Sequence, residues 1–207
     1  MNLILASASP RRAALLKEAG YAFVVRPADI DEESYLQKLP PARLASVLAS
    51  VKAGKIAEDA PEEVTLAADT VIAFDDVALG KPADEKEARD MLQLLSGATH
   101  IVITGVAVRC PGRKIDLTDT ALSAVRMSYL APEEIDAYII SGRWQGKAGG
   151  YGIQDADPIV KCVGGSISNV IGLPMQETRR LLEKAGVRPV PRTSDNLPSG
   201  QGGDPGV

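Results

Sequence analysis

The 207-residue sequence predicts an α/β protein with a mixed sheet and flanking helices. Apolar runs typical of buried strands alternate along the chain with segments whose apolar residues repeat at helical spacing. Prolines, glycines and capping residues divide these segments at the points where helices begin and end. The length fits one α/β domain or two small lobes that share a central cleft.

Five apolar runs between turn residues are predicted as strands, over residues 3–6, 64–74, 101–108, 117–129 and 159–163. The first leads directly into a predicted helix over residues 11–19. Ser9 is expected to cap this helix, Pro10 suits its first position, and Gly20 suits the left-handed residue after its end. The connecting turn therefore keeps free backbone N–H groups at the start of the helix.

Four further helices are predicted over residues 41–55, 85–95, 132–140 and 174–185. The apolar residues of the first form one stripe, and Lys52 lies beside that stripe. Asp84 and Glu87 have the spacing of a capping box, and Gly97 ends the same helix. The glycine-rich segment 146–154 is predicted as a loop in which the backbone closely approaches a ligand or another strand.

The composition argues against several classes of protein. A formal net charge of −4 is unlike that of proteins that bind a nucleic-acid polymer through clustered Lys and Arg. No apolar run reaches membrane-spanning length and the N-terminus lacks signal-peptide features, so we expect no membrane association and a cytoplasmic location. Cys110 and Cys162 are expected to be buried free thiols, and His100 is expected at a strand end without a catalytic role.

The C-terminal end differs in composition from the rest of the chain. From about Pro189 onward Pro, Gly, Ser and Asp dominate without an apolar period. Residues 1–188 are therefore predicted as the folded domain, and residues 189–207 as a disordered tail.

The segment Ser7-Ala8-Ser9-Pro10-Arg11-Arg12 is a candidate anion site between a strand and a helix. Free N–H groups, the positive end of a helix, two hydroxyls and two guanidinium groups suit a ligand such as a triphosphate. The alternative is a capped surface helix whose arginines are solvated.

Asp69 interrupts the mostly apolar strand predicted over residues 64–74. A carboxylate buried there is costly unless it is paired, hydrogen-bonded or bound to a cation, and such residues are typically kept for a function. The alternative is that Asp69 ends the strand in a turn and caps Thr70 and Val71.

Lys81 stands in a turn before a helix, and Asp31, Glu32 and Glu33 follow an apolar segment. Each feature alone is most often solvated surface, but together they supply cations for phosphate and carboxylates for a divalent metal. The turn at Lys81 lacks the upstream glycine and the following Ser or Thr of a Walker P-loop. No Gly-x-Gly-x-x-Gly follows a strand, which argues against a dinucleotide site.

In their order along the chain, these segments resemble the Maf family of nucleotide pyrophosphatases. The resemblance covers about residues 3 to 185. Two positions depart from the family pattern, since Gly150 replaces a frequent alanine and Ile167 a frequent aromatic residue. The matching segments are residues 3–12, 29–32, 51–53, 68–71, 80–82, 104–106, 147–154 and 165–174.

The resemblance implies a two-lobed fold related to the inosine triphosphate pyrophosphatases, with the substrate in the cleft, and a homodimer. It implies hydrolysis of dTTP and UTP to the monophosphate and pyrophosphate with Mg²⁺ or Mn²⁺. Asp69 is the implied proton acceptor, and Arg11, Thr70 and Gln154 match the dTTP/UTP subtype rather than the 7-methyl-GTP subtype. The residues implied around the triphosphate and its metal are Ser7, Arg12, Glu32, Lys52 and Lys81.

Two roles of Asp69 stay open at this point. As an ionised carboxylate it can orient a water as a general base, or it can ligate Mg²⁺ together with Glu32. Two rival functions also stay open: a nucleotide-sensing regulator of cell division that cleaves nothing, and a phosphatase that releases orthophosphate from the γ position.

Overall fold

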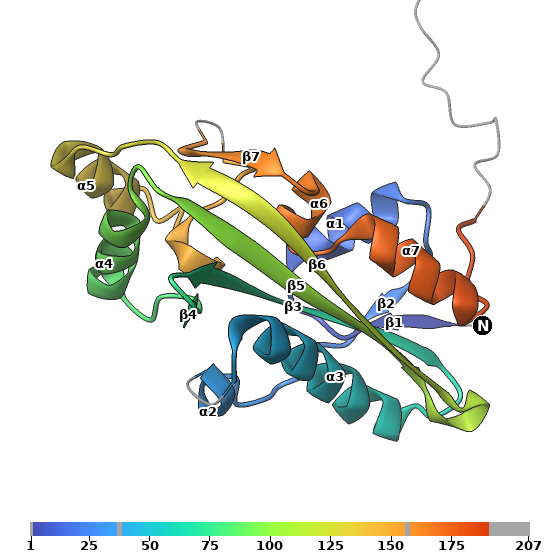
Figure 1. The fold of residues 1–207 in the computed structure, drawn as a ribbon. Helices are drawn as coiled ribbons and strands as arrows, with labels where there is room; N and C mark the ends of the chain where they lie inside the picture. The colour runs from blue at the N-terminus through green and yellow to red at the C-terminus, as the bar shows by residue number, and fades with distance from the viewer. Residues whose placement is uncertain (1, 37–38, 156–157, 191–207) are drawn as a thin grey trace, which may run out of the picture.

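The computed structural model describes residues 2–36, 39–155 and 158–190. β1 pairs in parallel with β2 and β3, and all other strand pairs are antiparallel, which confirms the predicted mixed sheet. The order is β2-β1-β3-β5-β6-β7, with β4 also paired to β3 (Figure 1). The seven strands found in these residues are β1 (Leu3–Leu5), β2 (Val24–Val25), β3 (Val64–Phe74), β4 (Val77–Leu79), β5 (Thr99–Cys110), β6 (Ile115–Met127) and β7 (Val160–Gly164).

Helices cover both faces of the long central strands (Figure 1). One face is covered by α3, and the short α2 lies near its N-terminal end. On the other face, α1, α6 and α7 gather at one end of the sheet and α4 and α5 at the opposite end. These helices are α1 (Pro10–Glu18), α2 (Glu33–Leu36), α3 (Pro41–Asp59), α4 (Glu85–Leu95), α5 (Pro132–Ile140), α6 (Ile167–Ile171) and α7 (Met175–Lys184).

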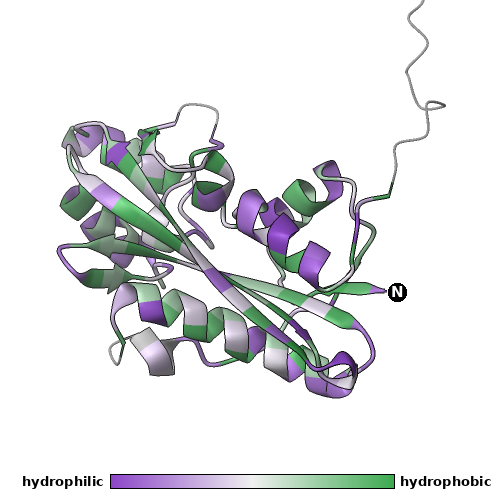
Figure 2. Ribbon diagram, turned by 45° about the vertical axis from the view of Figure 1, so that its right-hand side comes forward, coloured by the Kyte–Doolittle hydropathy of each residue, from purple (hydrophilic) through white to green (hydrophobic). Residues whose placement is uncertain are grey.

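The apolar core is divided between two lobes. One cluster packs α1 and α7 against β1, β3 and β5, and a second packs α4 and α5 against the far ends of β3, β5 and β6. In Figure 2 the central strands are largely green or white, and purple residues lie mainly on helices and loops. The predicted two-lobed α/β architecture is therefore confirmed.

One edge of β3 is left partly unpaired. β1 pairs with this edge as far as Leu66 and β4 pairs with it from Ile72 onward, whereas β5 pairs with the other edge from Thr65 to Ala73. Asp69 and Thr70 lie in the stretch between, where no strand of the described chain pairs with the first edge. The sheet thus forks there, and one edge of the middle of β3 has no strand partner in the described chain.

Helix α3 packs very closely on the sheet beside this fork. Gly105 of β5 is the register partner of Asp69, and a Cβ at Gly105 would lie 2.3 Å from the carbonyl oxygen of Ala45 in α3. That contact is with backbone, so no side chain fits without moving the helix. The close approach brings Lys52, farther along α3, next to Asp69.

Most predicted element boundaries hold to within a few residues. Helix α3 continues to Asp59 rather than Lys55, because the first residue after Lys55 that breaks a helix is Pro61. The elements missed from sequence, β2, β4, α2 and α6, span at most five residues, too few for a periodic pattern. Asp84 caps α4 as predicted, but the Glu87 carboxylate accepts from the Ala83 N–H instead of the Asp84 N–H.

The cysteine prediction is half right. Both thiols are free, and Cys110 is buried, but Cys162 in β7 is partly exposed, which corrects the expectation that both are buried. Cys162 lies on β7, the strand at one edge of the sheet. Among the described strands β7 pairs with β6 alone, so its other edge has no neighbouring strand. No helix in the described ranges is long and apolar enough to cross a membrane.

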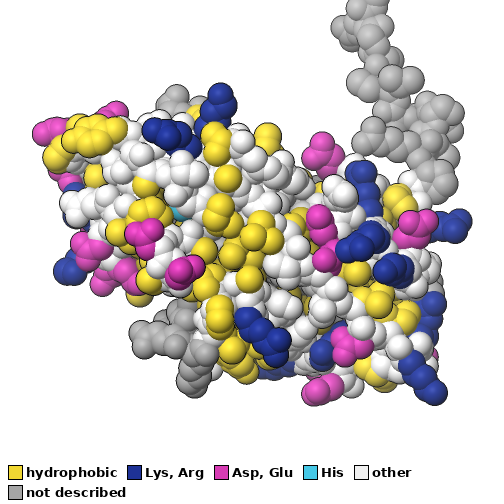
Figure 3. Space-filling model, viewed as in Figure 1, with side chains coloured by type: hydrophobic (Ala, Val, Ile, Leu, Met, Phe, Trp, Pro, Cys, Tyr) yellow, Lys and Arg dark blue, Asp and Glu magenta, His cyan; other side chains and the backbone are white. Residues whose placement is uncertain are grey.

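Two further expectations are not tested. Residues 191–207 of the predicted tail lie outside the described residues. The homodimer implied by the resemblance also stays a prediction. Figure 3 shows apolar side chains in a band across the middle of one face. The large apolar side chains that are exposed include Leu122 of β6, Val163 of β7 and Ile167 of α6.

His100 is buried near one end of β5 and forms a hydrogen bond of 2.5 Å through Nε2 with the Tyr151 hydroxyl. Burial lowers the pKa of His100 from 6.5 to about 4. The unfolded chain therefore takes up a proton at a higher pH than the folded chain. The share of stability due to neutral His100 is complete above pH 6.5 and is lost as the pH falls from there toward 4.

We expect the variant His100→Gln to lose this share of acid sensitivity, because glutamine keeps a hydrogen-bonding group but does not titrate. Between pH 7 and pH 4 the free energy of unfolding of the wild type should fall by up to about 3 kcal/mol more than that of the variant. Urea titrations at several pH values measure the difference. Parallel pH profiles of the two proteins would contradict the assignment.

Candidate active site

A cavity of about 410 Å³ lies at the fork of the sheet, between the two lobes. Its size falls within the range of small-ligand sites. The β1–α1 turn, β3, the turn after β4 and the loop before β7 form its walls. All the residues predicted for the site line it: Ser7, Arg11, Arg12, Glu32, Lys52, Asp69, Thr70, Lys81 and Gln154.

The first wall is the start of α1. The Ser9 hydroxyl caps the helix by accepting from the Arg12 N–H at 3.5 Å, and Pro10 opens the helix as predicted. The Ser7 hydroxyl accepts from the Ser9 N–H at 3.3 Å. These contacts hold the positive end of α1 against the cavity, where it favours an anion.

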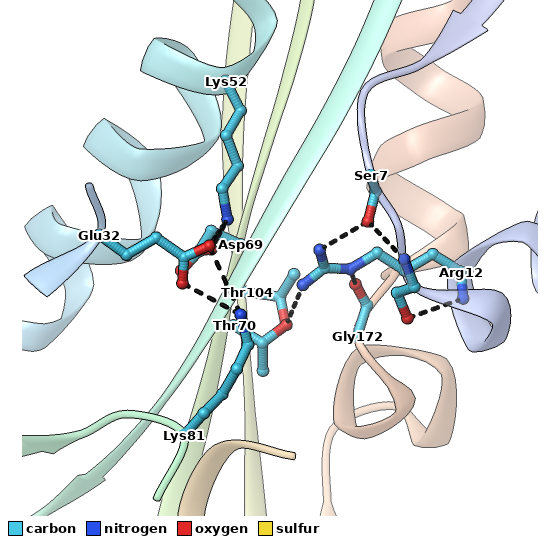
Figure 4. A network of polar contacts seen from close by, with 10 residues as sticks. Ser7, Arg12, Glu32, Lys52, Asp69, Thr70, Lys81, Thr104 and Gly172 are labelled. Carbon is cyan, nitrogen blue, oxygen red and sulfur yellow. Dashed lines mark hydrogen bonds and ion pairs between the residues drawn. The ribbon is translucent and has the colours of Figure 1, made fainter. Parts of the chain in front are cut away.

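Arg12 is held from three sides (Figure 4). Its Nε donates to the Gly172 carbonyl at 2.7 Å, Nη1 to the Ser7 hydroxyl at 3.1 Å and Nη2 to the Thr70 hydroxyl at 3.2 Å. Guanidinium has five N–H groups, so one remains on each Nη for a ligand, the fork that binds phosphate through two bonds. The alternative of a solvated surface side chain is wrong for Arg12.

Asp69 lies in the middle of β3, so the alternative that it ends the strand is wrong. Its side chain is 6% exposed, and the carboxylate accepts a hydrogen bond from Lys52 Nζ. Lys52 also lies 2.7 Å from one oxygen of Glu32, whose other oxygen is 3.1 Å from Lys81 Nζ. Two carboxylates and two ammonium groups thus alternate along this wall (Figure 4).

The pKa values of the two carboxyl groups are shifted in opposite directions. Burial raises the pKa of Asp69, although Lys52 and Arg12 act against the shift. Burial acts in the same direction on Glu32, but hydrogen bonds and charge from Lys52 and Lys81 prevail and lower its pKa. Asp69 is therefore the better proton acceptor of the two near neutral pH.

Glu32 and Asp69 provide a donor set that fits a divalent cation. Mg²⁺ is commonly held by one or two carboxylates, with water and substrate phosphate in its other positions. In the described part of the chain no group of three His, Cys, Asp or Glu side chains adds a fuller site. Lys52 now lies between the two carboxylates, so a cation there requires that its ammonium turns away.

The loop over residues 146–154 forms the far wall. Its backbone turns sharply through Gly149 and Gly150, with φ of 68° and 72°, and the Gly149 N–H donates to the Gly80 carbonyl at 2.9 Å. Gln154 is exposed on this loop and lines the cavity, and Arg11 donates to the Gly146 carbonyl at 3.3 Å. A Cβ at Gly149 would lie 2.9 Å from the Ile72 side chain of β3, so the predicted close approach of this backbone to another strand is confirmed.

Sequence reasoning missed several residues that organise the site. Thr104 and Asn169 are fully buried and connect to Thr70 through hydrogen bonds. Lys147 lines the cavity but is paired with Asp155. Thr104 and Asn169 lie inside segments that match the family motifs, but nothing in their residue types indicates a neighbour far along the chain.

The cavity has the character of a site for a small phosphorylated ligand. Outside the Lys147–Asp155 pair, four cationic side chains and two carboxylates of the described residues line it, a net charge of two positive units. An exposed amide at one end and apolar side chains such as Ile72, Val102 and Tyr151 complete its wall.

The comparison with known proteins agrees with this class. The model of the family described as Maf-like protein matches residues 2–185, and the chain belongs to this family. Similar curated proteins named dTTP/UTP pyrophosphatase occur in Hyphomonas neptunium, at 50% identity, and Cereibacter sphaeroides, at 46% identity. Both matches cover 90% of this chain and 96% of the relative.

A third relative named dTTP/UTP pyrophosphatase, from Bacillus pumilus, is 43% identical over 91% of this chain and 98% of its own length. A solved structure of a nucleoside-triphosphatase (dITP/XTP pyrophosphatase) from Mycobacterium abscessus aligns with a TM-score of 0.48 at 14% identity. That alignment covers 89% of this chain and 94% of the other.

Proposed function

We propose that the protein hydrolyses dTTP and UTP to the nucleoside monophosphate and pyrophosphate. The observation that carries the proposal is the placement of Asp69, a buried carboxylate whose pKa is raised by burial, among cationic side chains in one cavity. Membership of the Maf family and the printed names of its relatives support the same substrates.

The charge of the cavity fits this substrate class. A nucleoside triphosphate carries about four negative charges near neutral pH, because its terminal phosphate titrates near the value of other phosphate monoesters. The cavity side chains supply two positive units, and a bound Mg²⁺ or Mn²⁺ would supply two more. When bound by Glu32 and Asp69, such a cation would neutralise charge on the phosphate oxygens.

Side chains of the cavity would then position the phosphates and the attacking water. Arg12 holds phosphate oxygens with its two free N–H groups, and Lys81 neutralises charge at the opposite wall. Asp69 orients a water toward the α-phosphorus and accepts its proton. A new P–O bond forms to that water while the bond to the bridging oxygen of the β-phosphate breaks, so pyrophosphate leaves.

The rival functions predict different behaviour. A regulator that only binds a triphosphate does not need a proton acceptor beside the phosphates. A phosphatase acting at the γ position releases orthophosphate first. Incubation of the protein with dTTP, UTP and other triphosphates in Mg²⁺ or Mn²⁺, followed by ion chromatography, separates these functions. Orthophosphate as first product, or no turnover, would refute the proposal.

Gln154 is the residue that we propose as a reader of the base. The amide both donates and accepts, so it can meet two of the three polar groups on the pairing edge of uracil or thymine. We expect Gln154→Glu to lower kcat/KM for dTTP and UTP about tenfold or more and to raise the ratio of GTP to UTP activity.

The matched control for this prediction is Gln145→Glu, which adds the same charge at an exposed position outside the cavity. Steady-state kinetics with dTTP, UTP and GTP on both variants measure kcat/KM for each base and so test whether Gln154 recognises the base. An equal loss on all three substrates in Gln154→Glu would assign the residue to structure or catalysis instead of base recognition.

A further inference from the structure

Two hydroxyl groups and one carbonyl group continue inward from Arg12, from half-buried Thr70 to fully buried Thr104 and Asn169. The Thr70 hydroxyl lies 3.0 Å from the Thr104 hydroxyl (Figure 4). The Thr104 hydroxyl in turn donates to the Asn169 carbonyl at 3.1 Å. Thr104 and Asn169 are fully buried, so no solvent replaces a missing partner in this chain of groups.

The chemistry of these groups allows one direction only. Arg12 has donors alone and the Asn169 carbonyl accepts alone, while each hydroxyl has a single hydrogen to give. Thr104 gives its hydrogen to Asn169, so the hydrogen of Thr70 must point to Thr104. Thr70 is thereby left as an acceptor toward Arg12 and the cavity. In the reverse arrangement two oxygen lone pairs would face each other in a buried place.

We infer that Thr104 is a positioning residue, which fixes Thr70 as a hydrogen-bond acceptor and so holds the Arg12 fork in the orientation that binds phosphate. A run of hydrogen bonds in one direction strengthens each of its members. The contacts from Gly172 and Ser7 fix the other two corners of the guanidinium. Among the described residues, the Thr70 contact alone has a side-chain hydrogen bond behind it, from Thr70 to Thr104. This inference rests on the proposed function only in taking phosphate as the group that Arg12 binds.

The test measures binding of inorganic tripolyphosphate by calorimetry, which needs no turnover. Thr104→Val keeps the shape and removes the hydroxyl, and it should weaken binding about fivefold, the scale of one neutral hydrogen bond. Thr104→Ser restores the hydroxyl and should bind within about twofold of the wild type. In a Thr70→Val background, Thr104→Val should add no further loss.

A matched control comes from β3 itself. Thr65 is fully buried and its hydroxyl has no partner among the described residues, so Thr65→Val makes the same change of side chain without breaking a hydrogen bond. Its tripolyphosphate binding should equal that of the wild type. Thermal melting of all variants shows whether each is folded at the temperature of the titration.

Three results would overturn the inference: wild-type affinity in Thr104→Val, an equal loss in the Thr70→Val background, or no tripolyphosphate binding by the wild type. Turnover of dTTP is measured on the same samples. If the binding pattern is found without any turnover, the proposed function fails and the role of Thr104 stands.

Discussion

Replacing Asp69 by asparagine is expected to lower kcat for dTTP by about 100-fold or more, the scale of a positioned general base. Asparagine has nearly the same size and still accepts a hydrogen bond from Lys52, so the fold should remain intact. Unlike the carboxylate, the amide cannot accept a proton from water near neutral pH. Steady-state kinetics with dTTP and UTP measure the loss.

The same substitution should change stability little. The neutral amide avoids the desolvation penalty of the buried carboxylate, and Lys52 is not left as an unpaired buried charge because it keeps its ion pair with Glu32. Binding of dTTP should also persist, because the proposed phosphate contacts of Arg12 and Lys81 are unchanged. Asp116→Asn, at an exposed position paired with Arg109, is the matched control and should keep full activity.

Wild-type kcat in Asp69→Asn would remove this residue from the mechanism. A large loss of kcat together with a lower melting temperature and lost binding would instead show that Asp69 is needed for the fold. Kinetics, calorimetry and thermal melting of one protein sample therefore distinguish the catalytic role from a structural one.

Replacing Arg12 by alanine is expected to raise the dissociation constant for a triphosphate by about 100-fold or more. Two charge-assisted hydrogen bonds are lost, each contributing roughly 1.5–3 kcal/mol. The nucleoside alone should bind almost as before, because the group faces phosphate. Calorimetry with a non-hydrolysable dTTP analogue and with thymidine measures both affinities.

A second measurement on Arg12→Ala concerns Asp69. The charge of Arg12 helps to hold down the pKa of Asp69, so its removal should move the acid limb of the pH profile of kcat/KM to higher pH. Arg89→Ala, at a surface position paired with Asp136, is the control. Equal weakening of nucleotide and nucleoside, with an unmoved profile, would assign Arg12 to folding.

The fold was largely predictable because its long elements have strong local signals. Apolar runs located β3, β5 and β6, and proline with a capping residue located the start of α1 within one residue. Lys52 and Asp69 were predicted as site residues from the family resemblance and, for Asp69, from a charge inside an apolar strand. Their direct contact was not predictable, since it depends on how α3 crosses the sheet.

The supporting residues were beyond the sequence for a physical reason. Thr104, Asn169 and Gly172 act through hydrogen bonds to residues from 34 to 160 positions away, and no local pattern encodes such partners. Glu32 was predicted from the family resemblance and as one of three adjacent acidic residues. The residue types alone did not single it out, and its contacts with Lys52 and Lys81 depend on the fold.

Gly105 links thermal stability to activity, two properties that protein engineering usually changes separately. Replacement of glycine within a strand by a residue with a Cβ is a common way to gain thermal stability. Here the added methyl would force α3 off the sheet and carry Lys52 away from Asp69, since the Cβ position overlaps the Ala45 backbone. A side chain at Gly105 would therefore harm both the packing of α3 and the active site. Variants selected for higher activity or for higher thermal stability should both keep Gly105.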